Sequence, residues 1–384
     1  MSSAPAYDFG TADLDRLLAL LAGDGYTCIG PIVHDGAIVY DTIDGSADLP
    51  RGWTDEQAPG HYRLLRRDDD ALFGYNVGPQ AWKRCLFPPR ERVWQMSIEG
   101  EAFVPAPEAD DAARHAFIGV RACELAAIGV QDRVFGGGSF HDGAYLARRA
   151  EAFVVAVNCV EAGGTCFCAD MGTGPAAHDG HDIALTELVD GDRHRFLAVA
   201  GSPRGAALLA RLGAAAADTE LEADAAAGIE HARASMGRHL ATDGLPALLA
   251  RSLDSPHWET VAERCLACAN CTAVCPTCFC SSVEDTADLD GALATRWRQW
   301  DSCFNPGFSY LHGGEVRRST AARYRQWLTH KLGTWHDQFG SSGCVGCGRC
   351  ITWCPVGIDL TAETARLREL DAQGAGRAAP NGGS

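Results

Sequence analysis

The sequence predicts an N-terminal α/β domain with a mainly parallel sheet, followed by a mostly α-helical domain built around two cysteine motifs. From residue 116 onward, short apolar runs alternate with segments of helical spacing, the pattern of a sheet covered by helices. The second domain is indicated by two matching runs, Cys265-x-x-Cys268-x-x-Cys271-x-x-x-Cys275-Pro276 and Cys344-x-x-Cys347-x-x-Cys350-x-x-x-Cys354-Pro355. We expect the α/β domain at 1–204, an alanine-rich helical linker at 205–254, the second domain at 255–366 and a disordered tail at 367–384.

Apolar periodicity predicts the individual elements. Between the two cysteine runs, residues 323–333 have helical spacing, which favours a helical second domain over a compact β-containing type. The other expected helices are 11–23, 121–135 and 202–213, and the expected strands are 27–33, 36–42, 116–120, 153–159, 182–188 and 196–201.

Composition indicates an ordinary globular protein of the cytoplasm. Hydrophobic residues make up 46% of the chain and charged residues 22%, and no apolar run approaches the length of a membrane span. Met1–Gly10 lacks the basic and apolar regions of a signal peptide, so we expect the 17 cysteines to remain reduced and available to metal. The net charge of −17 argues against binding to nucleic acid or to an anionic membrane.

Each cysteine run has the bacterial ferredoxin spacing for a [4Fe–4S] cluster. Three closely spaced thiolates can surround one cubane, while the fourth, before a proline, reaches the other. We therefore expect a ferredoxin-like domain with crosswise ligation. Structural zinc is the alternative, although zinc sites usually use two cysteine pairs for one ion. The expected ligand sets are Cys265, Cys268, Cys271 and Cys354 for one cluster, and Cys344, Cys347, Cys350 and Cys275 for the other.

Four further cysteines follow two predicted strands. Cys123 lies at a strand-to-helix junction, and Cys159, Cys166 and Cys168 lie in a glycine-containing loop after the next strand. Carboxyl ends of parallel strands share one sheet edge, so these thiols are candidate ligands of a third [4Fe–4S] cluster. The alternative is four packed, metal-free thiols, because the spacings match no general cluster rule.

Other features leave their roles open. Cys28 and Cys85 are expected to be buried structural residues, whereas Cys278, Cys280 and Cys303 fit packing, support of a cluster or reaction with a sulfur compound. No catalytic residues are predicted. The segment 291–331 is rich in basic residues, which fits a solvated helix face, a docking patch or guanidinium donors near a cluster.

Five segments together resemble the β (iron–sulfur) subunit of soluble NADP-linked [NiFe]-hydrogenases, or sulfhydrogenases, a family with relatives among the anaerobic sulfite reductases. The segments are GVRACELAAIGVQDRVF, NCVEAGGTCFCADMGTGP, CLACANCTAVCPTCFC, WDSC and CVGCGRCITWCPVGID, and they span roughly 117–360. Many relatives carry proline where this chain has Ala122, and aspartate where it has Glu124.

The resemblance implies a non-catalytic electron-transfer subunit of a soluble oxidoreductase complex. Its expected partners are a γ-type subunit that binds flavin and NADP, together with the small and large subunits of a [NiFe] hydrogenase. The resemblance also favours the third cluster. An electron-transfer subunit of an anaerobic sulfite or sulfur reductase complex is the alternative, and an iron–sulfur redox sensor or scaffold is a hypothesis of another class.

Overall fold

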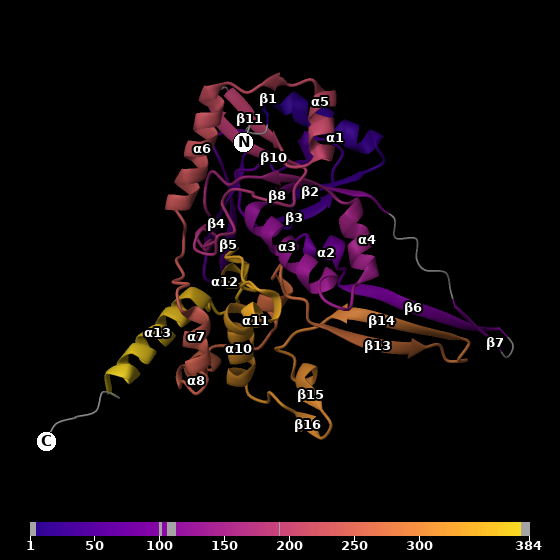
Figure 1. Cartoon of the computed structure of the whole chain (residues 1–384), viewed down its shortest axis with the longest axis vertical. Helices are drawn as coiled ribbons and strands as arrows, with labels where there is room; N and C mark the ends of the chain where they lie inside the picture. Colours follow the sequence, from indigo (N-terminus) through magenta and orange to yellow (C-terminus); the bar gives the residue numbers. More distant parts are fainter. Residues whose placement is uncertain (1–4, 100–101, 106–112, 192, 378–384) are drawn as a thin grey trace.

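The computed structural model describes residues 5–99, 102–105, 113–191 and 193–377. An eight-stranded sheet forms the core of the upper body in Figure 1, and a second, narrower sheet projects from its side. The helices of the C-terminal region lie below the main sheet (Figure 1). Among the described residues, no helix is both long and apolar enough to cross a bilayer.

The main sheet is mixed rather than mainly parallel, which corrects the expectation from the sequence. Its central strands β2, β8, β9 and β10 are parallel, and antiparallel strands flank them on both sides. The turn at Asp35–Gly36, with both φ angles positive, closes a hairpin that the sequence analysis did not recognise. The strand order is β12 (Ala215–Ala216), β1 (Ala6–Phe9), β11 (Arg193–Ala200), β10 (Ile183–Asp190), β9 (Phe153–Val157), β8 (His115–Arg121), β2 (Thr27–His34) and β3 (Ala37–Thr42).

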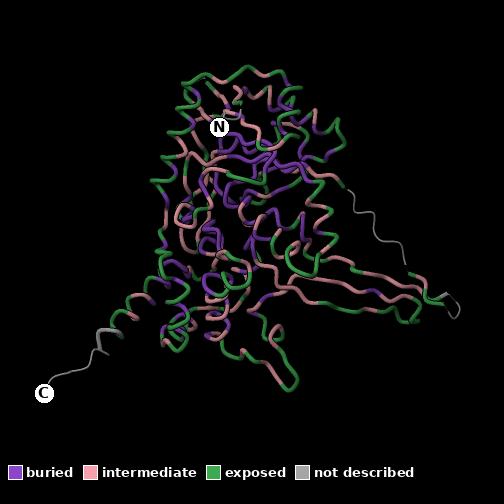
Figure 2. Tube along the Cα trace, in the orientation of Figure 1, coloured by how far each residue is buried: buried purple, intermediate pink, exposed green. Residues whose placement is uncertain are grey.

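Both faces of this sheet are covered by helices. Alternate residues of β9 point to opposite sides: Val155 packs in the core that also holds Leu17 of α1, and Val154 packs in the core that holds Ile128 of α3. Figure 2 shows the resulting buried centre. The helices of this region are α1 (Thr11–Gly23), α2 (Lys83–Leu86), α3 (Ala122–Gly136), α4 (Gly143–Glu151), α5 (Pro203–Leu212) and α6 (Thr219–Ala234), with a short 3-10 turn η1 (Ser46–Asp48).

The expected linker at 205–254 is largely part of the α/β body. Leu208, Leu209 and Leu212 of α5 are buried in the core beside α1, and β12 adds an edge strand. Helix α6 contacts β10 and β11. The alanine-rich composition thus reflects helices packed on a sheet rather than a spacer.

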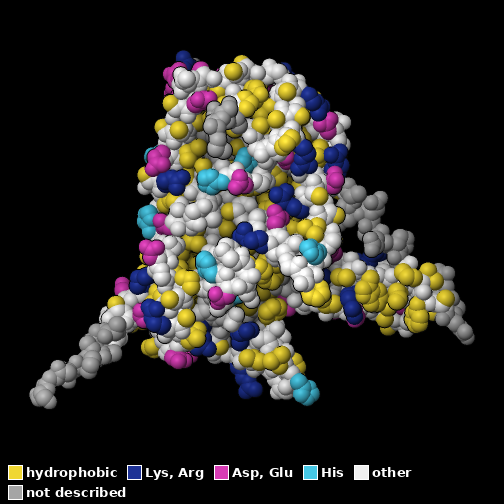
Figure 3. Space-filling model, viewed as in Figure 1, with side chains coloured by type: hydrophobic (Ala, Val, Ile, Leu, Met, Phe, Trp, Pro, Cys, Tyr) yellow, Lys and Arg dark blue, Asp and Glu magenta, His cyan; other side chains and the backbone are white. Residues whose placement is uncertain are grey.

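The C-terminal region is less helical than expected. Strands β13 and β14 pair with β6 and β7 in an antiparallel arm, so this sheet joins segments far apart in the sequence (Figure 1). The arm carries exposed apolar side chains, including Val93, Phe103 and Val283 (Figure 3). Its strands are β6 (Arg90–Glu99), β7 (Ala102–Pro105), β13 (Ser281–Ala287) and β14 (Leu293–Trp300).

The remaining elements surround the cysteine motifs. The predicted helix at 323–333 is present as α10 and a π-helical turn. The expected disordered tail is wrong for 367–377, because α13 continues there and buries Leu367; residues 378–384 lie outside the described residues. These elements are β4 (Trp53–Ala58), β5 (His61–Arg66), α7 (Leu245–Arg251), α8 (His257–Ala262), α9 (Asn270–Ala273), η2 (Pro306–Ser309), β15 (Tyr310–Leu311), β16 (Gly314–Glu315), α10 (Thr320–Thr329), η3 (His330–Thr334), α11 (Trp335–Phe339), α12 (Arg349–Thr352) and α13 (Leu360–Arg377).

A buried ion pair joins the two cysteine-bearing regions. Arg349 donates to Glu124, and the two side chains expose 0% and 1% of their surface. Tyr40 and Trp82 also donate to Glu124, at 2.8 and 3.2 Å. Arg349 further donates to the carbonyl of Gly78 at 2.8 Å. Every charge in this centre is therefore compensated by a partner from another element.

Loss of one partner of this pair should strongly destabilise the chain. In Glu124→Gln, Arg349 keeps a buried charge without its counter-ion, which costs about 3–5 kcal/mol. Anaerobic urea unfolding of the full chain would measure this loss. Glu369→Gln, which removes an exposed pair with Arg366, is the control and should leave the midpoint unchanged. Equal midpoints for both variants would contradict the assignment.

Candidate iron–sulfur site

The first three cysteines of the first motif share a cavity with the last cysteine of the second. Cys265, Cys268, Cys271 and Cys354 line a partly open space of about 470 Å³, and Cys350 also reaches its wall. The cavity is mostly apolar, with Phe304, Tyr324 and Trp327 among its lining residues. This is the grouping that crosswise ligation requires.

Backbone N–H groups point at several of the motif sulfurs. The N–H of Ala267 lies 3.4 Å from Cys265 Sγ, and that of Ile358 lies 3.3 Å from Cys354 Sγ. In the second motif, the N–H of Gly346 lies 3.5 Å from Cys344 Sγ, at the position equivalent to Ala267. Such bonds stabilise negative charge on sulfur, and they tune the potential of a cluster held there.

Cys344, Cys347, Cys350 and Cys275 form a second group, in which all but the partly buried Cys350 are buried. Burial raises the pKa of Cys344 to about 12, against the opposing charge of Lys331, and it also raises the pKa values of Cys347 and Cys350. All three thiols interact electrostatically with Cys275. Since a ligating thiol must lose its proton, metal binding here would release protons.

Cys275 differs from its three neighbours. A hydrogen bond from Cys278 and the charge of Lys331 hold the pKa of Cys275 well below its usual range, although burial acts in the opposite direction. Lys331 Nζ lies 3.3 Å from Cys275 Sγ. Burial works against the charge of Lys331, but the surrounding thiols, first Cys275, raise its pKa. The ammonium group of Lys331 thus favours the ionised form of Cys275.

The four N-terminal cysteines form the third group of thiols and line a cavity of their own, which we call the third cavity. Cys123 is the second residue of α3, just after β8, and Cys159, Cys166 and Cys168 lie in the loop that follows β9. The carboxyl ends of these two parallel strands therefore meet here, as predicted. The cavity encloses about 350 Å³ of empty space. Burial raises the pKa of Cys166 to about 12.

Arg121 is the buried cation of this third cavity. Its Nη1 lies 3.8 Å from Cys159 Sγ, and its Nη2 donates to the carbonyls of Phe73 and Tyr75 at 2.6 and 2.7 Å. Arg121 was not recognised from the sequence, although it stands two residues before Cys123 in the segment that carries the family resemblance.

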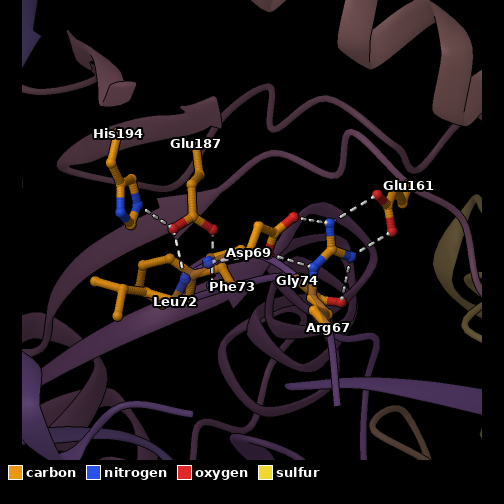
Figure 4. Close-up of polar contacts among 9 residues, drawn as sticks. Arg67, Asp69, Leu72, Phe73, Gly74, Glu161, Glu187 and His194 are labelled. Carbon is orange, nitrogen blue, oxygen red and sulfur yellow. Dashed lines mark hydrogen bonds and ion pairs between the residues drawn. The ribbon is translucent and has the colours of Figure 1, made fainter. Parts of the chain in front are cut away.

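A polar network holds the loop that supports Arg121 (Figure 4). Glu187 of β10 accepts the N–H groups of Leu72 and Phe73 at 2.6 and 2.7 Å, and it pairs with His194 at 2.7 Å. Arg67 bridges Asp69 and Glu161, and Glu161 also lines the third cavity (Figure 4). The carbonyls that hold Arg121 are thus fixed from both ends of the loop.

The remaining cysteines divide into two groups. Cys28 is buried in the sheet core, and Cys85 packs partly buried on α2, as expected for structural residues. Cys278 hydrogen-bonds Cys275 of the second group, whereas Cys303 packs in one cluster with Cys265 and Cys271 of the first. A hydrogen bond from Cys303 lowers the pKa of Cys280 to about 7.

The basic segment 291–331 does not form one patch. Arg298 pairs with Glu91 and Asp142 in a partly buried cluster, and Arg323 donates to backbone carbonyls. Lys331 alone among these residues hydrogen-bonds a cysteine within the described part of the chain. Basic residues that are close together in the sequence therefore make separate local contacts in the structure.

The donor sets fit iron–sulfur clusters better than single ions. Among the described residues, no three His, Cys, Asp or Glu side chains converge as they would around one metal ion. A cubane presents its irons at separate corners, so its thiolates stand farther apart than those of a single tetrahedral ion. In the first group and in the N-terminal group, four thiols line the wall of one cavity, which suits a cubane.

Comparison with known proteins agrees with this geometry. Residues 264–358 match the family model of a 4Fe-4S dicluster domain. The chain is 35% identical over 290 residues to Sulfhydrogenase 2 subunit beta of Pyrococcus furiosus, an alignment that covers 75% of this chain and 82% of the relative. No solved structure matches the chain significantly.

The second motif should tolerate no side chain at Gly348. This residue has φ 75°, and an added Cβ would lie 2.4 Å from Thr165 Oγ1, in the loop that carries Cys166 and Cys168. Gly348→Ala should therefore cost more than about 2 kcal/mol, from the left-handed backbone and the clash. Ala269 has φ 64° at the equivalent position of the first motif, so Ala269→Gly is the matched control and should stabilise by up to about 1 kcal/mol. Anaerobic denaturant unfolding distinguishes them, and equal stability of Gly348→Ala and wild type would refute the close approach of the two loops.

Proposed function

The chain belongs to the family of sulfhydrogenase β subunits, and we propose that it relays electrons through three [4Fe–4S] clusters within a multi-subunit hydrogenase complex. Each [4Fe–4S] group would accept and release one electron at a potential that the surrounding protein sets. The chain's own contribution is to hold these groups in a fixed row and to adjust the charge around them.

The proposed ligand sets follow the three groups of thiols. The first set is Cys265, Cys268, Cys271 and Cys354, the second is Cys344, Cys347, Cys350 and Cys275, and the third is Cys123, Cys159, Cys166 and Cys168.

The order of the sets is the observation that carries the proposal. Cys350 of the second set reaches the wall of the first cavity. Cys347 of the second set packs in one cluster of side chains with Cys123, Cys166 and Cys168 of the third. The second set therefore lies between the other two. A continuous row of this kind is what a relay requires, whereas a sensor needs only one responsive group.

The row can be approached from the surface at more than one place. Cys268 is exposed, and the neighbouring Leu266 is 63% exposed, so the first set lies near the surface. A separate groove with about 810 Å³ of empty space is lined by Val130, Thr173 and Cys344, and it reaches the second set. Two approaches allow one partner to deliver electrons and another to remove them.

As partners in the cytoplasm, we propose a γ-type subunit that binds flavin and NADP, together with the small and large [NiFe] hydrogenase subunits. The relative's name specifies one subunit of a sulfhydrogenase, which favours this complex. A sulfite or sulfur reductase complex is the second candidate, because the same relay would serve a different terminal site. The two are distinguished by the partner that copurifies with the native chain, a nickel-containing protein or a sirohaem protein.

Alanine variants of the twelve cysteines should fall into three groups of four. The reconstituted chain should hold about twelve irons, at four per cubane. Each variant should lose one electron paramagnetic resonance (EPR) signal, and Cys354→Ala should lose the same signal as Cys265→Ala, because both thiols line one cavity. Cys28→Ala is the control and should retain every signal. If Cys354→Ala instead lost the signal of Cys344→Ala, crosswise ligation would be wrong. Full iron content in Cys166→Ala would eliminate the third cluster.

The purified chain alone should transfer electrons without turning over either terminal substrate. We expect it to accept electrons from a low-potential donor, because biological [4Fe–4S] potentials reach about −700 mV. It should show neither hydrogen oxidation nor NADP reduction, since its proposed role supplies only the connection. Anaerobic stopped-flow absorption measures the first property and product assays the second. NADP reduction by a preparation free of flavin protein would falsify the relay assignment.

A further inference from the structure

The chain contains only two lysines, Lys83 and Lys331, and both are buried. They are 4% and 3% exposed, although lysine is ordinarily a surface residue. All other side chains counted among the 33 basic residues are arginine. Both lysines lie against the same short segment, Cys275–Cys278. Both lysines of this chain thus lie in the interior, beside the segment that carries the candidate ligand Cys275.

Lys331 uses its ammonium group on that segment and on the start of the second motif. Its Nζ donates to Cys275 Sγ at 3.3 Å, to Thr277 Oγ1 at 3.0 Å and to the Gly343 carbonyl at 3.2 Å. These contacts account for all three ammonium protons. Thr277 Oγ1 in turn lies 3.2 Å from Cys275 Sγ. The ammonium group therefore lies in direct contact with the sulfur of a proposed ligand.

The backbone at Lys331 is unusual in the same place. Residues His330–Thr334 form a π-helical turn between α10 and α11. A π-turn inserts one extra residue into a helix and changes the direction of the side chains that follow, and such turns are frequent at functional sites. Here the turn carries Lys331, whose ammonium reaches Cys275.

Lys83 reaches the segment from the other side of the molecule. It belongs to α2 in the α/β body, and its Nζ donates to the Cys278 carbonyl at 3.2 Å. It also lies 3.7 Å from the centre of the Trp300 ring. Its hydrogen bond is made to a carbonyl rather than to a ligand sulfur, so the two lysines share burial but differ in contact. Burial lowers the pKa of Lys83, whereas the neighbouring thiols, first Cys275, raise the pKa of Lys331 against the effect of its burial.

We propose that Lys331 raises the reduction potential of the second cluster, the one assigned to Cys344, Cys347, Cys350 and Cys275. The inference rests on the proposed ligand sets. Reduction adds negative charge, and an ammonium group donating to a ligand sulfur stabilises that charge in a buried site. Lysine suits this task because its charge is compact and can lie against one sulfur, whereas the guanidinium of arginine is a broad planar fork.

The proposed consequence is an electron reservoir in the middle of the row. With the potential of the second set raised, an electron that enters at the first or the third set passes to the second set. It stays there until a partner protein oxidises the chain. The relay then remains usable in both directions, since neither end retains the electron.

The test is an EPR-monitored redox titration of the full reconstituted chain carrying Lys331→Met. We expect the midpoint of the signal that Cys344→Ala abolishes to fall by the equivalent of at least a tenfold change in its reduction equilibrium, about 59 mV for one electron. The other two midpoints should stay unchanged. Lys331→Gln, which keeps a donor without the charge, should show the same fall if the methionine variant proves unstable. Lys331→Arg should recover most of the wild-type value.

Lys83→Met is the matched control, because it removes an equally buried ammonium that does not touch a ligand sulfur. It should shift the same midpoint by less than Lys331→Met does. A wild-type midpoint in Lys331→Met with full iron content would overturn the proposal, as would equal shifts in the two lysine variants. Failure of the ligand sets themselves would be visible separately, as a wild-type chain without three reducible signals or as a shift in the signal that Cys265→Ala abolishes.

Discussion

The buried pair of Glu124 and Arg349 is the contact on which the arrangement of the thiols depends. Glu124 directly follows Cys123 of the third set, and Arg349 directly precedes Cys350 of the second. A charge pair this deep is costly to desolvate, and it is tolerated only when both partners and their remaining hydrogen bonds are in place. The pair therefore fixes the start of α3, with Cys123, against α12, with Cys350.

Neighbouring contacts reinforce this dependence. Thr165, from the loop of the third set, shares hydrogen bonds with Thr352 and Gln57, at 2.7 and 3.0 Å. Gln57 belongs to the β4–β5 hairpin, which lies against α12 and thereby adds a third segment to the same joint. The glycines of the second motif permit the loop to approach this closely. The α/β body and the motif region thus share a buried, hydrogen-bonded interface. They are better described as one unit than as two domains joined by a linker.

Local apolar patterns predicted strands at 116–120 and 153–159, and the structure has strands at His115–Arg121 and Phe153–Val157. Short segments suffice here because a buried strand is a short apolar run. The pairing of β6 with β14 was beyond such reasoning, since a strand pattern does not name its partner. The Asp-Gly turn at Asp35–Gly36 is a readable hairpin signal between β2 and β3, but the antiparallel pairs β10–β11 and β1–β11 also make the sheet mixed. Lys331 could have been noticed from the scarcity of lysine, but its contact with Cys275 depends on tertiary packing.

The net charge of −17 makes the buried cations more informative. Cys159 has Arg121 at 3.8 Å, and Cys275 has Lys331 at 3.3 Å. The charge of Arg349 likewise opposes the effect of burial on Cys347. These cations lie beside the two more deeply buried groups of thiols, where water would screen little of the negative charge that four thiolates of a bound cluster would carry. The first set lies near the surface and can use solvent for part of that task. In this acidic protein, the buried cations Arg121, Lys331 and Arg349 thus lie beside the thiol groups that are most deeply buried.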